Sequence, residues 1–448
     1  MKQMSTTMKT TIKMALPAMI ESFFICFAGF LDSIMVSSLG PEAVASVGLT
    51  TQPKFIGYAI FTALSVSLSA LVARRLGEGE RDKANALLST GVLTAVILAA
   101  IIGFLMSFFA SPIIKFCGSN ADTHDGAVLY FKIIMGCMIF NCIQICINAI
   151  QRGVGNTKIT MRTNLTSNTV NVIFNYLLIG GKFGFPALGI RGAAIATILG
   201  AAVSCTMSII SVCKKDCYVN FIYIIQNKIK PRLVSLVNII KLGYSIFLEQ
   251  LLIRAGFLAT ALMAADQGTS AMAAHQACLN VISLSFAIGD GLQHAAVALI
   301  GRSLGEKNPD MAKEYGKKCH KIGGIMSIVF AVVFLLFSRW IMWLFFPKDP
   351  DIIDIGVSIM YILTVAVLLQ IRQCIYMGSL RGAGDTKYTA FISAFSITVT
   401  RTIVGYVCCY MLGMGIFGVW MGVLADQVTR FIMSGARYKK GKWVSIKI

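Results

Sequence analysis

The sequence predicts an all-α polytopic membrane protein with twelve transmembrane helices, arranged as two six-helix lobes related by a parallel pseudo-twofold repeat. The first observation is composition: of 448 residues, 56% are hydrophobic and only 13% are charged, and the mean hydropathy is +0.75. Soluble domains carry about 25% charged residues. The second and third observations are apolar runs that recur along the whole chain and an internal repeat.

Apolar runs of about 20 residues are long enough to cross a bilayer, and glycine and proline fall in the gaps between them. The expected spans are 13–38, 46–73, 85–111, 126–150, 160–180, 188–212, 236–264, 270–301, 321–345, 354–378, 389–412 and 414–434. We therefore expect an N-lobe at 1–212, a cytoplasmic linker at 213–235 and a C-lobe with a basic tail at 236–448. No cleavable signal peptide is expected.

The formal net charge is +20, which in a soluble protein would suggest a nucleic-acid partner. Here the basic residues gather at the N-terminus, in the even-numbered loops and in the tail. The odd-numbered loops hold few of them, namely Lys115, Lys182, Arg191, Arg339 and Lys348. This asymmetry predicts that both termini are cytoplasmic, and it leaves no reason to expect nucleic acid.

The chain repeats itself at an offset of about 228 residues. IKMALPAMIE aligns with IKLGYSIFLE, which places Glu21 on Glu249, and SSLGPEAVAS aligns with ADQGTSAMAA, which places Gly40 on Gly268. ARRLGEGERDKAN and QRGVGNTKIT also have counterparts, IGRSLGEKNPDMAK and LRGAGDTKYT. Six spans per half is an even number, so the halves keep one orientation, as in transporters built from parallel repeats.

Asp32 lies in the outer half of the first span, and a carboxylate at membrane depth is by default a functional candidate. Span 160–180 carries four amides on one helical face: Asn164, Asn168, Asn171 and Asn175. Asn171, Asn175 and, on the next span, Thr197 lie near the depth of Asp32. These oxygens suit Na⁺ or a protonatable acid held by hydrogen bonds. For Asn164 and Asn168, hydrogen bonds between helices are the simpler explanation.

The second half carries its own polar candidates, Glu249 and Arg254 on one span and Asp290 and His294 on the next. Charges of both signs occur there, so mutual ion pairing is an alternative to a role in transport. Glu21 and Glu249 occupy equivalent cytoplasmic positions, where they could hold an inner gate or line the cavity. The 13 cysteines show no paired CxxC spacing and the four histidines no HExxH pattern, so no metalloenzyme is indicated.

At these residues the chain resembles the bacterial branch of the multidrug and toxic compound extrusion (MATE) family. The resemblance extends over nearly the whole chain and rests on DSIMVSSLGPEAVAS, VARRLGEGERDKAN, QRGVGNTK with LRGAGDTK, NVIFNYLLIGGKFGFPALGIRGAAIAT, GTSAMAAHQ and Arg401. It implies a V-shaped pair of six-helix lobes, alternating access, and export of cationic or amphipathic compounds against inward Na⁺ or H⁺. It also implies an ion site at Asp32, Asn171, Asn175 and Thr197.

Two departures from the family pattern matter. One branch has a second aspartate where this chain has Asn175, so the coupling ion is left open between Na⁺ and H⁺. Another branch pairs the Glu249 position with an acid on the tenth span, but this chain has none between Asp354 and Arg381. A second ion site in the C-lobe would then need Asp290.

We expect a secondary active multidrug exporter in the bacterial plasma membrane, a monomer without a bound cofactor, whose partners are small organic substrates and the lipid bilayer. The alternative is a flippase for lipid-linked oligosaccharides of the same superfamily, which needs cations inside its cavity for pyrophosphate. Arg254, Arg372 and Arg401 keep that alternative open. An enzyme is not expected, because no loop is long enough to form a catalytic domain.

Overall fold

In the computed structural model, residues 6–214 and 217–446 are described, and every regular element within these ranges is a helix. Residues 1–5, 215–216 and 447–448 of the predicted N-lobe, linker and tail lie outside the described part. The chain divides into two compact units. One is Phe23–Gly243, and the other joins the residues up to Ser22 to the chain from Tyr244 onward. Two helices, α1 and α10, therefore contribute residues to both units.

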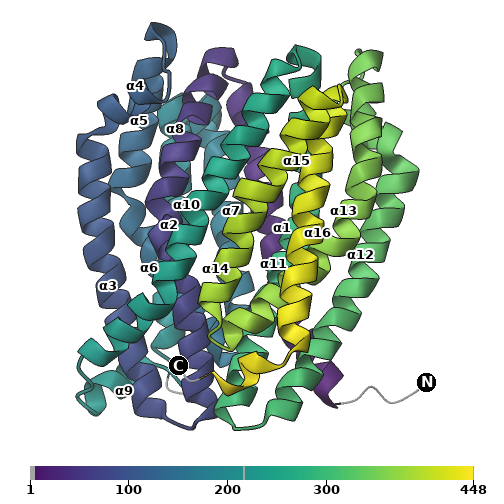
Figure 1. The fold of residues 1–448 in the computed structure, drawn as a ribbon. Helices are drawn as coiled ribbons and strands as arrows, with labels where there is room; N and C mark the ends of the chain where they lie inside the picture. Colours follow the sequence, from purple (N-terminus) through teal and green to yellow (C-terminus); the bar gives the residue numbers. More distant parts are fainter. Residues whose placement is uncertain (1–5, 215–216, 447–448) are drawn as a thin grey trace. The chain divides into compact units, whose positions relative to one another are not determined.

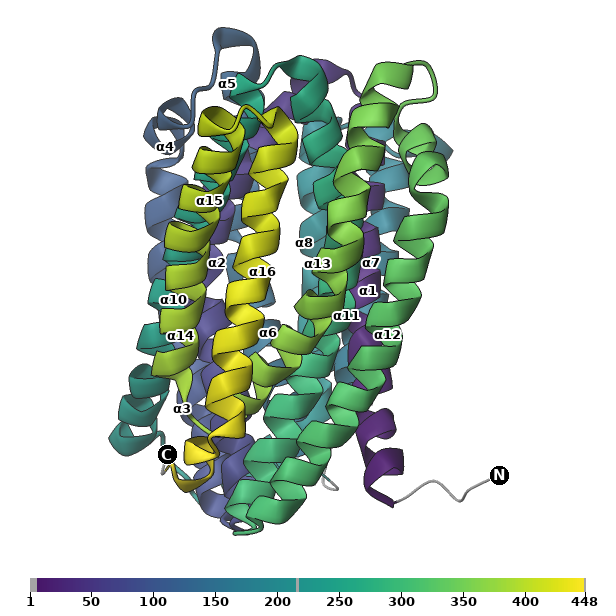
Figure 2. The same cartoon turned by 45° about the vertical axis from the view of Figure 1, so that its right-hand side comes forward.

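Within each unit the long helices run side by side (Figures 1 and 2). The helices up to residue 226 are α1 (Thr6–Ser37), α2 (Pro41–Gly77), α3 (Arg81–Phe108), α4 (Ala110–Phe116), α5 (Ala121–Gly136), α6 (Met138–Val154), α7 (Thr157–Gly180), α8 (Ile190–Val212) and α9 (Phe221–Gln226). A single 3₁₀ turn, Lys182–Gly184, follows α7. The predicted linker, 213–235, thus contains a short helix, α9, and its last three residues already belong to α10, which begins at Leu233.

The later helices are α10 (Leu233–Asp266), α11 (Thr269–Gly305), α12 (Pro309–Phe345), α13 (Pro350–Gly382), α14 (Thr386–Ala394), α15 (Thr402–Tyr406) and α16 (Gly415–Lys439). Among them, α10, α11, α12, α13 and α16 are longer than the spans expected from hydropathy, because they continue beyond the apolar runs at one or both ends. Two π-helical stretches, Phe395–Arg401 and Val407–Met411, interrupt the expected span 389–412. Such widened turns are frequent at functional sites.

In the described ranges, ten helical segments are long and apolar enough to cross a membrane by themselves, one of them the continuous run Thr386–Met411 that α14, α15 and the two π-helical stretches form. A bent pair, α5 and α6, would make an eleventh span, with a 47° bend at the break between them. The expected span 126–150 is therefore not one straight helix, because α5 ends at Gly136 and α6 restarts after Cys137. The expected span 160–180 corresponds to α7, whose 24 residues are too polar to meet the same criterion. Twelve spans thus stay a prediction.

The bounds of the helices recur at the offset found in the sequence. Both α2 and α11 have 37 residues, and each follows a glycine with nearly the same backbone angles, φ 100° and ψ 172° at Gly40 and φ 100° and ψ 169° at Gly268. A φ of this sign is strained for any residue but glycine. The α6 helix ends at Val154 and α13 at Gly382, again 228 residues later.

Glycines set a close approach between α7 and α8, the two helices that carry the predicted amides and Thr197. A Cβ atom added at Gly192 would lie 2.5 Å from the Leu178 backbone oxygen, and one at Gly200 would lie 2.6 Å from the Ser167 oxygen. Side chains larger than hydrogen would force these backbones apart, as at other close helix crossings in membranes. Gly200 stands one turn from Thr197, so this contact fixes the distance between the polar faces of the two helices.

Candidate functional site

The amide face of α7 divides into two parts in the structure. Nearer the start of the helix, Asn164 accepts a hydrogen bond of 2.7 Å from Gln144 on α6, and Asn168 donates one of 3.4 Å to the Phe24 backbone oxygen on α1. These two amides join neighbouring helices, which is the simpler role considered for them. Asn171 and Asn175, one and two turns further along, both point at Asp32.

Asp32 is the carboxylate at the centre of this group. Asn175 donates a hydrogen bond of 2.7 Å from Nδ2 to Asp32 Oδ1. The Asn171 amide has one orientation in which both its nitrogen and its oxygen form hydrogen bonds. In that orientation Asn171 donates to Asp32 Oδ1 at 2.6 Å and accepts from Thr197 Oγ1 at 3.2 Å. The structure therefore brings together the four residues of the predicted N-lobe site, from α1, α7 and α8. Asn171 and Asn175 are buried, and Asp32 and Thr197 are half-buried.

Two further side chains reach this group that sequence reasoning did not include. Lys54 on α2 attracts Asp32 electrostatically, and its Nζ atom lies 5.5 Å from the ring centroid of Tyr130 on α5. Tyr130 is buried beside Thr197. Lys54 stands in the interior of a 37-residue apolar helix, so the rule that singles out Asp32 also singles out this lysine. We call Asp32, Lys54, Asn171, Asn175 and Thr197 the Asp32 cluster.

The Asp32 cluster is suited to one monovalent cation or one proton. It holds a single carboxylate, and the described residues contain no group of three or more His, Cys, Asp or Glu side chains placed to hold a metal ion. Two amide donors and a nearby ammonium offset part of the cost of burying the Asp32 charge. Asn175 Oδ1 is buried and has no hydrogen-bond partner among the described residues, so a hard acceptor is available beside the carboxylate.

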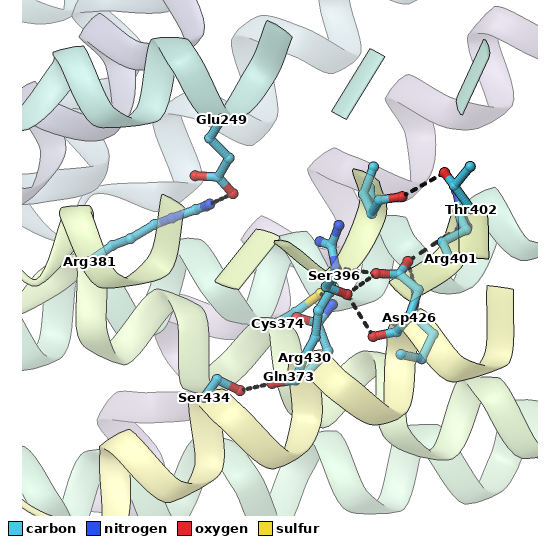
Figure 3. Close-up of polar contacts among 12 residues, drawn as sticks. Glu249, Gln373, Cys374, Arg381, Ser396, Arg401, Thr402, Asp426, Arg430 and Ser434 are labelled. Atoms are coloured by element: carbon cyan, nitrogen blue, oxygen red, sulfur yellow. Dashed lines mark hydrogen bonds and ion pairs between the residues drawn. The ribbon is translucent and has the colours of Figure 1, made fainter. Parts of the chain in front are cut away.

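In the unit that contains the chain from Tyr244 onward, the predicted candidates Glu249 and Asp290 have different surroundings. Glu249 forms a buried ion pair with Arg381 of the LRGAGDTK segment, with 2.6 Å between Oε1 and Nη2 (Figure 3). Asp290 is exposed although it lies in the interior of α11, and Arg381 also attracts it electrostatically. Ion pairing, the alternative considered for this half, therefore applies to Glu249.

The other predicted residues lie outside these contacts. Arg254 on α10 and His294 on α11 are half-buried, with His294 one turn after Asp290. Glu21 is buried on the first part of α1 and belongs to a different unit from Asp32. Thr260, the repeat counterpart of Asp32, is buried and donates to the Gly256 backbone oxygen at 2.9 Å.

A second buried network, which the sequence analysis did not identify, surrounds Asp426 on α16. Arg430 donates to Asp426 Oδ1 at 2.8 Å, Arg401 Nε lies 3.6 Å from Oδ2, and Ser396 donates to the same side chain (Figure 3). The Arg401 guanidinium also lies 4.7 Å from the Phe257 ring centroid. The signal was present, because Asp426 and Arg430 are four residues apart on an apolar helix.

Known proteins resemble this chain along nearly its whole length. The MatE family profile matches residues 17–177 and 245–407. The probable multidrug resistance protein NorM of Thermotoga maritima is 28% identical over 439 residues, which cover 97% of this chain and 93% of that protein. The uncharacterized transporter YisQ of Bacillus subtilis is 24% identical over 434 residues, which cover 96% of this chain and 93% of that protein.

Solved structures share the fold. One, described as the outward-facing conformation of a multidrug resistance MATE family transporter of the MOP superfamily, has a TM-score of 0.90 at 22% identity and covers 97% of both chains. Another, a MOP superfamily transporter from Pyrococcus furiosus described as having a binding pocket of reverse polarity, has a TM-score of 0.90 at 21% identity, with 98% and 97% covered. Sequence and fold agree with the resemblance found in the motifs: the chain belongs to the MatE family, whose members are membrane transporters and not enzymes.

Proposed function

We propose that this chain is a secondary active multidrug exporter, which expels cationic or amphipathic organic compounds in exchange for inward Na⁺ or H⁺. The relatives from Thermotoga maritima and Pasteurella multocida, both named probable multidrug resistance protein NorM, support the substrate class, since the matches cover 93% and 94% of their lengths. The observation that carries the coupling part is the Asp32 cluster: one carboxylate at membrane depth, bonded to two amides and attracted by an ammonium.

We infer that the chain has twelve spans in two parallel six-helix lobes, with α7 as the span that hydropathy misses. At about 1.5 Å per residue, the 24 residues of α7 are about 36 Å long, enough to cross a hydrocarbon core of about 30 Å. The family profile matches twice, with starts 228 residues apart, which supports the repeat. The bias of basic residues supports cytoplasmic termini in a plasma membrane. The exporter acts as a monomer in this proposal.

In the transport cycle, Asp32 exchanges its amide partners for a cation from the outer aqueous phase. Neutralising the carboxylate removes the cost of burying its charge, which allows α1 and its neighbours to repack and lowers the affinity for the organic substrate. The substrate leaves outward and the cation leaves to the cytoplasm. The cation shifts this equilibrium only by its differential affinity for the two states, and a tenfold difference supplies about 1.4 kcal/mol.

The two candidate ions make different demands on the Asp32 cluster. Na⁺ binds oxygen atoms, so Asn171 and Asn175 would have to turn their amides, which now direct nitrogen at the carboxylate. A proton needs a single acceptor, because a protonated Asp32 still accepts from an amide with one oxygen and donates from the other; a turn of Asn175 alone would supply its unpartnered Oδ1. Imposing the Na⁺ gradient and the pH gradient separately distinguishes the two.

The flippase alternative receives no support from the relatives, which are named as multidrug resistance proteins or transporters. It requires arginines that face a pyrophosphate. Of the three arginines considered for it, Arg401 faces Asp426 and the Phe257 ring, Arg254 is half-buried on α10 and Arg372 is exposed on α13. We therefore retain the exporter and assign ion coupling to the Asp32 cluster, with Glu249 engaged in its ion pair.

The test is uptake of a fluorescent organic cation by inside-out membrane vesicles, under a Na⁺ gradient and, separately, a pH gradient. We expect one gradient to drive uptake in the wild type and Asp32→Asn to abolish it. A matched control is Asp310→Asn, because the Asp310 side chain is 91% exposed on the first turn of α12. Equal amounts of both variants in the membrane establish that insertion is intact.

Uptake by Asp32→Asn at the wild-type rate under either gradient would overturn the coupling assignment. Uptake that follows neither gradient in the wild type, but requires ATP, would overturn secondary transport itself.

A further inference from the structure

A basic cleft lies where the turn between α2 and α3 meets the start of α10. Its volume is about 210 Å³, and the described residues contribute no carboxylate to its lining. We define the basic cleft by three cations and three apolar residues: Arg75, Lys83, Arg232, Leu71, Leu87 and Val234. A second hollow of about 440 Å³ shares Lys83 and Arg232, extends toward α9 and is lined by Glu80 and Asp82 as well as by Arg81. The cleft thus combines a positive end with an apolar wall.

Two of the cations are held in place by neighbouring glutamates. Arg75 Nη1 lies 2.5 Å from Glu78 Oε2, and Lys83 Nζ lies 2.6 Å from Glu80 Oε1. The hydrogen bond from Lys83 lowers the pKa of Glu80, so this glutamate is ionised at neutral pH. Orientation by the glutamates fixes where the ammonium and the guanidinium stand, and both side chains still line the cleft.

Arg232 differs from the other two cations. Its backbone N–H donates to Thr90 Oγ1 at 3.1 Å, which anchors the residue to α3. Its guanidinium is exposed, and the described structure contains no hydrogen bond or ion pair to it. A guanidinium offers several donors in a fixed plane that matches a phosphate group. The backbone of Arg232 is therefore anchored, and its guanidinium is exposed where a phosphate group could bind it.

Side-chain contacts join the wall toward α9 to the start of α3. Arg81 at the start of α3 donates to the Tyr218 backbone oxygen at 2.9 Å, and its guanidinium lies 4.1 Å from the Tyr223 ring centroid. The Tyr223 hydroxyl donates to Asp82 at 2.8 Å. These contacts hold α9 against the first turn of α3, and Figure 1 shows the two helices side by side at that end. The residues that line the hollow on this side are therefore joined to one another.

An apolar face continues directly from the cleft along the first turns of α10. It consists of the exposed side chains of Leu233, Val234, Val237 and Ile240, of which Leu233 and Val234 are 75% and 71% exposed. Positions 233, 237 and 240 recur at helical spacing, so they form one stripe. In a membrane protein, such a stripe beside basic residues at a span end faces lipid chains.

We propose that the basic cleft binds the headgroup of an anionic phospholipid of the cytoplasmic leaflet. Its phosphodiester accepts hydrogen bonds from Arg232 and Lys83 beside the Arg75 guanidinium, and its acyl chains lie along the stripe of α10. Basic pockets at the cytoplasmic ends of membrane helices bind such headgroups. The apolar stripe favours a lipid over free phosphate, because free phosphate would leave the stripe without a function.

The test is native mass spectrometry of the detergent-purified protein, titrated with phosphatidylglycerol or with phosphatidylcholine of the same acyl chains. We expect one tightly retained phosphatidylglycerol in the wild type. Arg232→Gln and Lys83→Gln should each lower its affinity about fivefold, the effect of one basic residue near an anionic lipid. Lys230→Gln is the matched control, because Lys230 is exposed two residues before Arg232 and does not line the cleft. Thermal unfolding without lipid verifies that each variant is folded.

Three results would overturn the proposal. Equal retention of both lipids would show that binding does not depend on the charge of the headgroup. An equal loss of phosphatidylglycerol affinity in Lys230→Gln would show that the lipid is held by general electrostatic attraction and not by a defined site. Inorganic phosphate that displaces phosphatidylglycerol at equal concentration would assign the cleft to free phosphate, since the stripe would then add nothing.

Discussion

Replacing Lys54 with glutamine is expected to raise the affinity of the Asp32 cluster for its coupling cation about tenfold. Lys54 attracts Asp32 electrostatically, and the described structure has no direct ion pair between them. Two unit charges 4 Å apart interact by about 4 kcal/mol at an effective dielectric constant of about 20. This is an upper limit, and a half-buried lysine at a longer distance should interact by about 1–2 kcal/mol. The same ammonium repels a cation that binds at Asp32, so its removal gives a gain of this size.

The assay is the Na⁺ concentration, or the pH, that gives half-maximal uptake of an organic cation in inside-out vesicles. For Na⁺ coupling, the midpoint in Lys54→Gln should fall about tenfold, and for proton coupling it should move up by about one pH unit. Lys54→Arg should keep the wild-type midpoint. Lys182→Gln is a matched control, because Lys182 also lies over a tyrosine ring, 4.2 Å from the centroid of Tyr176. An unchanged midpoint in Lys54→Gln would refute the reasoning, since it would mean that Lys54 exerts no field on the bound cation.

Three further substitutions test other parts of the structure. Asn175→Asp should place a second carboxylate beside Asp32 and raise cation affinity by about tenfold or more in the same vesicle assay. A half-maximal cation concentration equal to or above that of the wild type would contradict this. Glu249→Gln should leave the Arg381 guanidinium buried without its partner charge, at a cost of about 3–5 kcal/mol; a wild-type midpoint of thermal unfolding in detergent would show that the pair contributes little. Gly200→Val should separate α7 from α8 and abolish coupled uptake while the protein still inserts, and uptake at the wild-type rate would show that the contact does not position the amides.

The fold class and the amide face were accessible from the sequence because both depend on local periodicity. Apolar runs of bilayer length identify spans whatever their neighbours are, and spacings of three and four residues put Asn171 and Asn175 on one face of a helix. Depth within the bilayer then linked them to Asp32 and Thr197. The 47° bend between α5 and α6 could not be predicted in this way, because hydropathy continues through it.

The pairings of charged side chains were not accessible, because they depend on which helices become neighbours. Glu249 was predicted as a transport candidate, and only the structure shows that Arg381, 132 residues later, lies 2.6 Å away from it. Lys54 and Asp426 were missed for a different reason. Both stand in apolar helices, where the rule applied to Asp32 should have singled them out. Neither of them was considered as a candidate in the sequence analysis.

The internal repeat provides an independent argument that Lys54 and Asp32 act together. The anchors at Gly40 with Gly268 and at Gly77 with Gly305 share one offset, so Asp32 corresponds to Thr260 and Lys54 to Ile282. Both counterparts are buried and uncharged, and Thr260 satisfies its hydroxyl within its own helix. A lone lysine or a lone carboxylate at either place would be costly in the membrane, so the two charges are tolerated best as a pair. The two halves thus differ by both charges at once. This is the pattern expected if the Lys54 ammonium sets the cation affinity of Asp32, because the ammonium would have no such role where the carboxylate is absent.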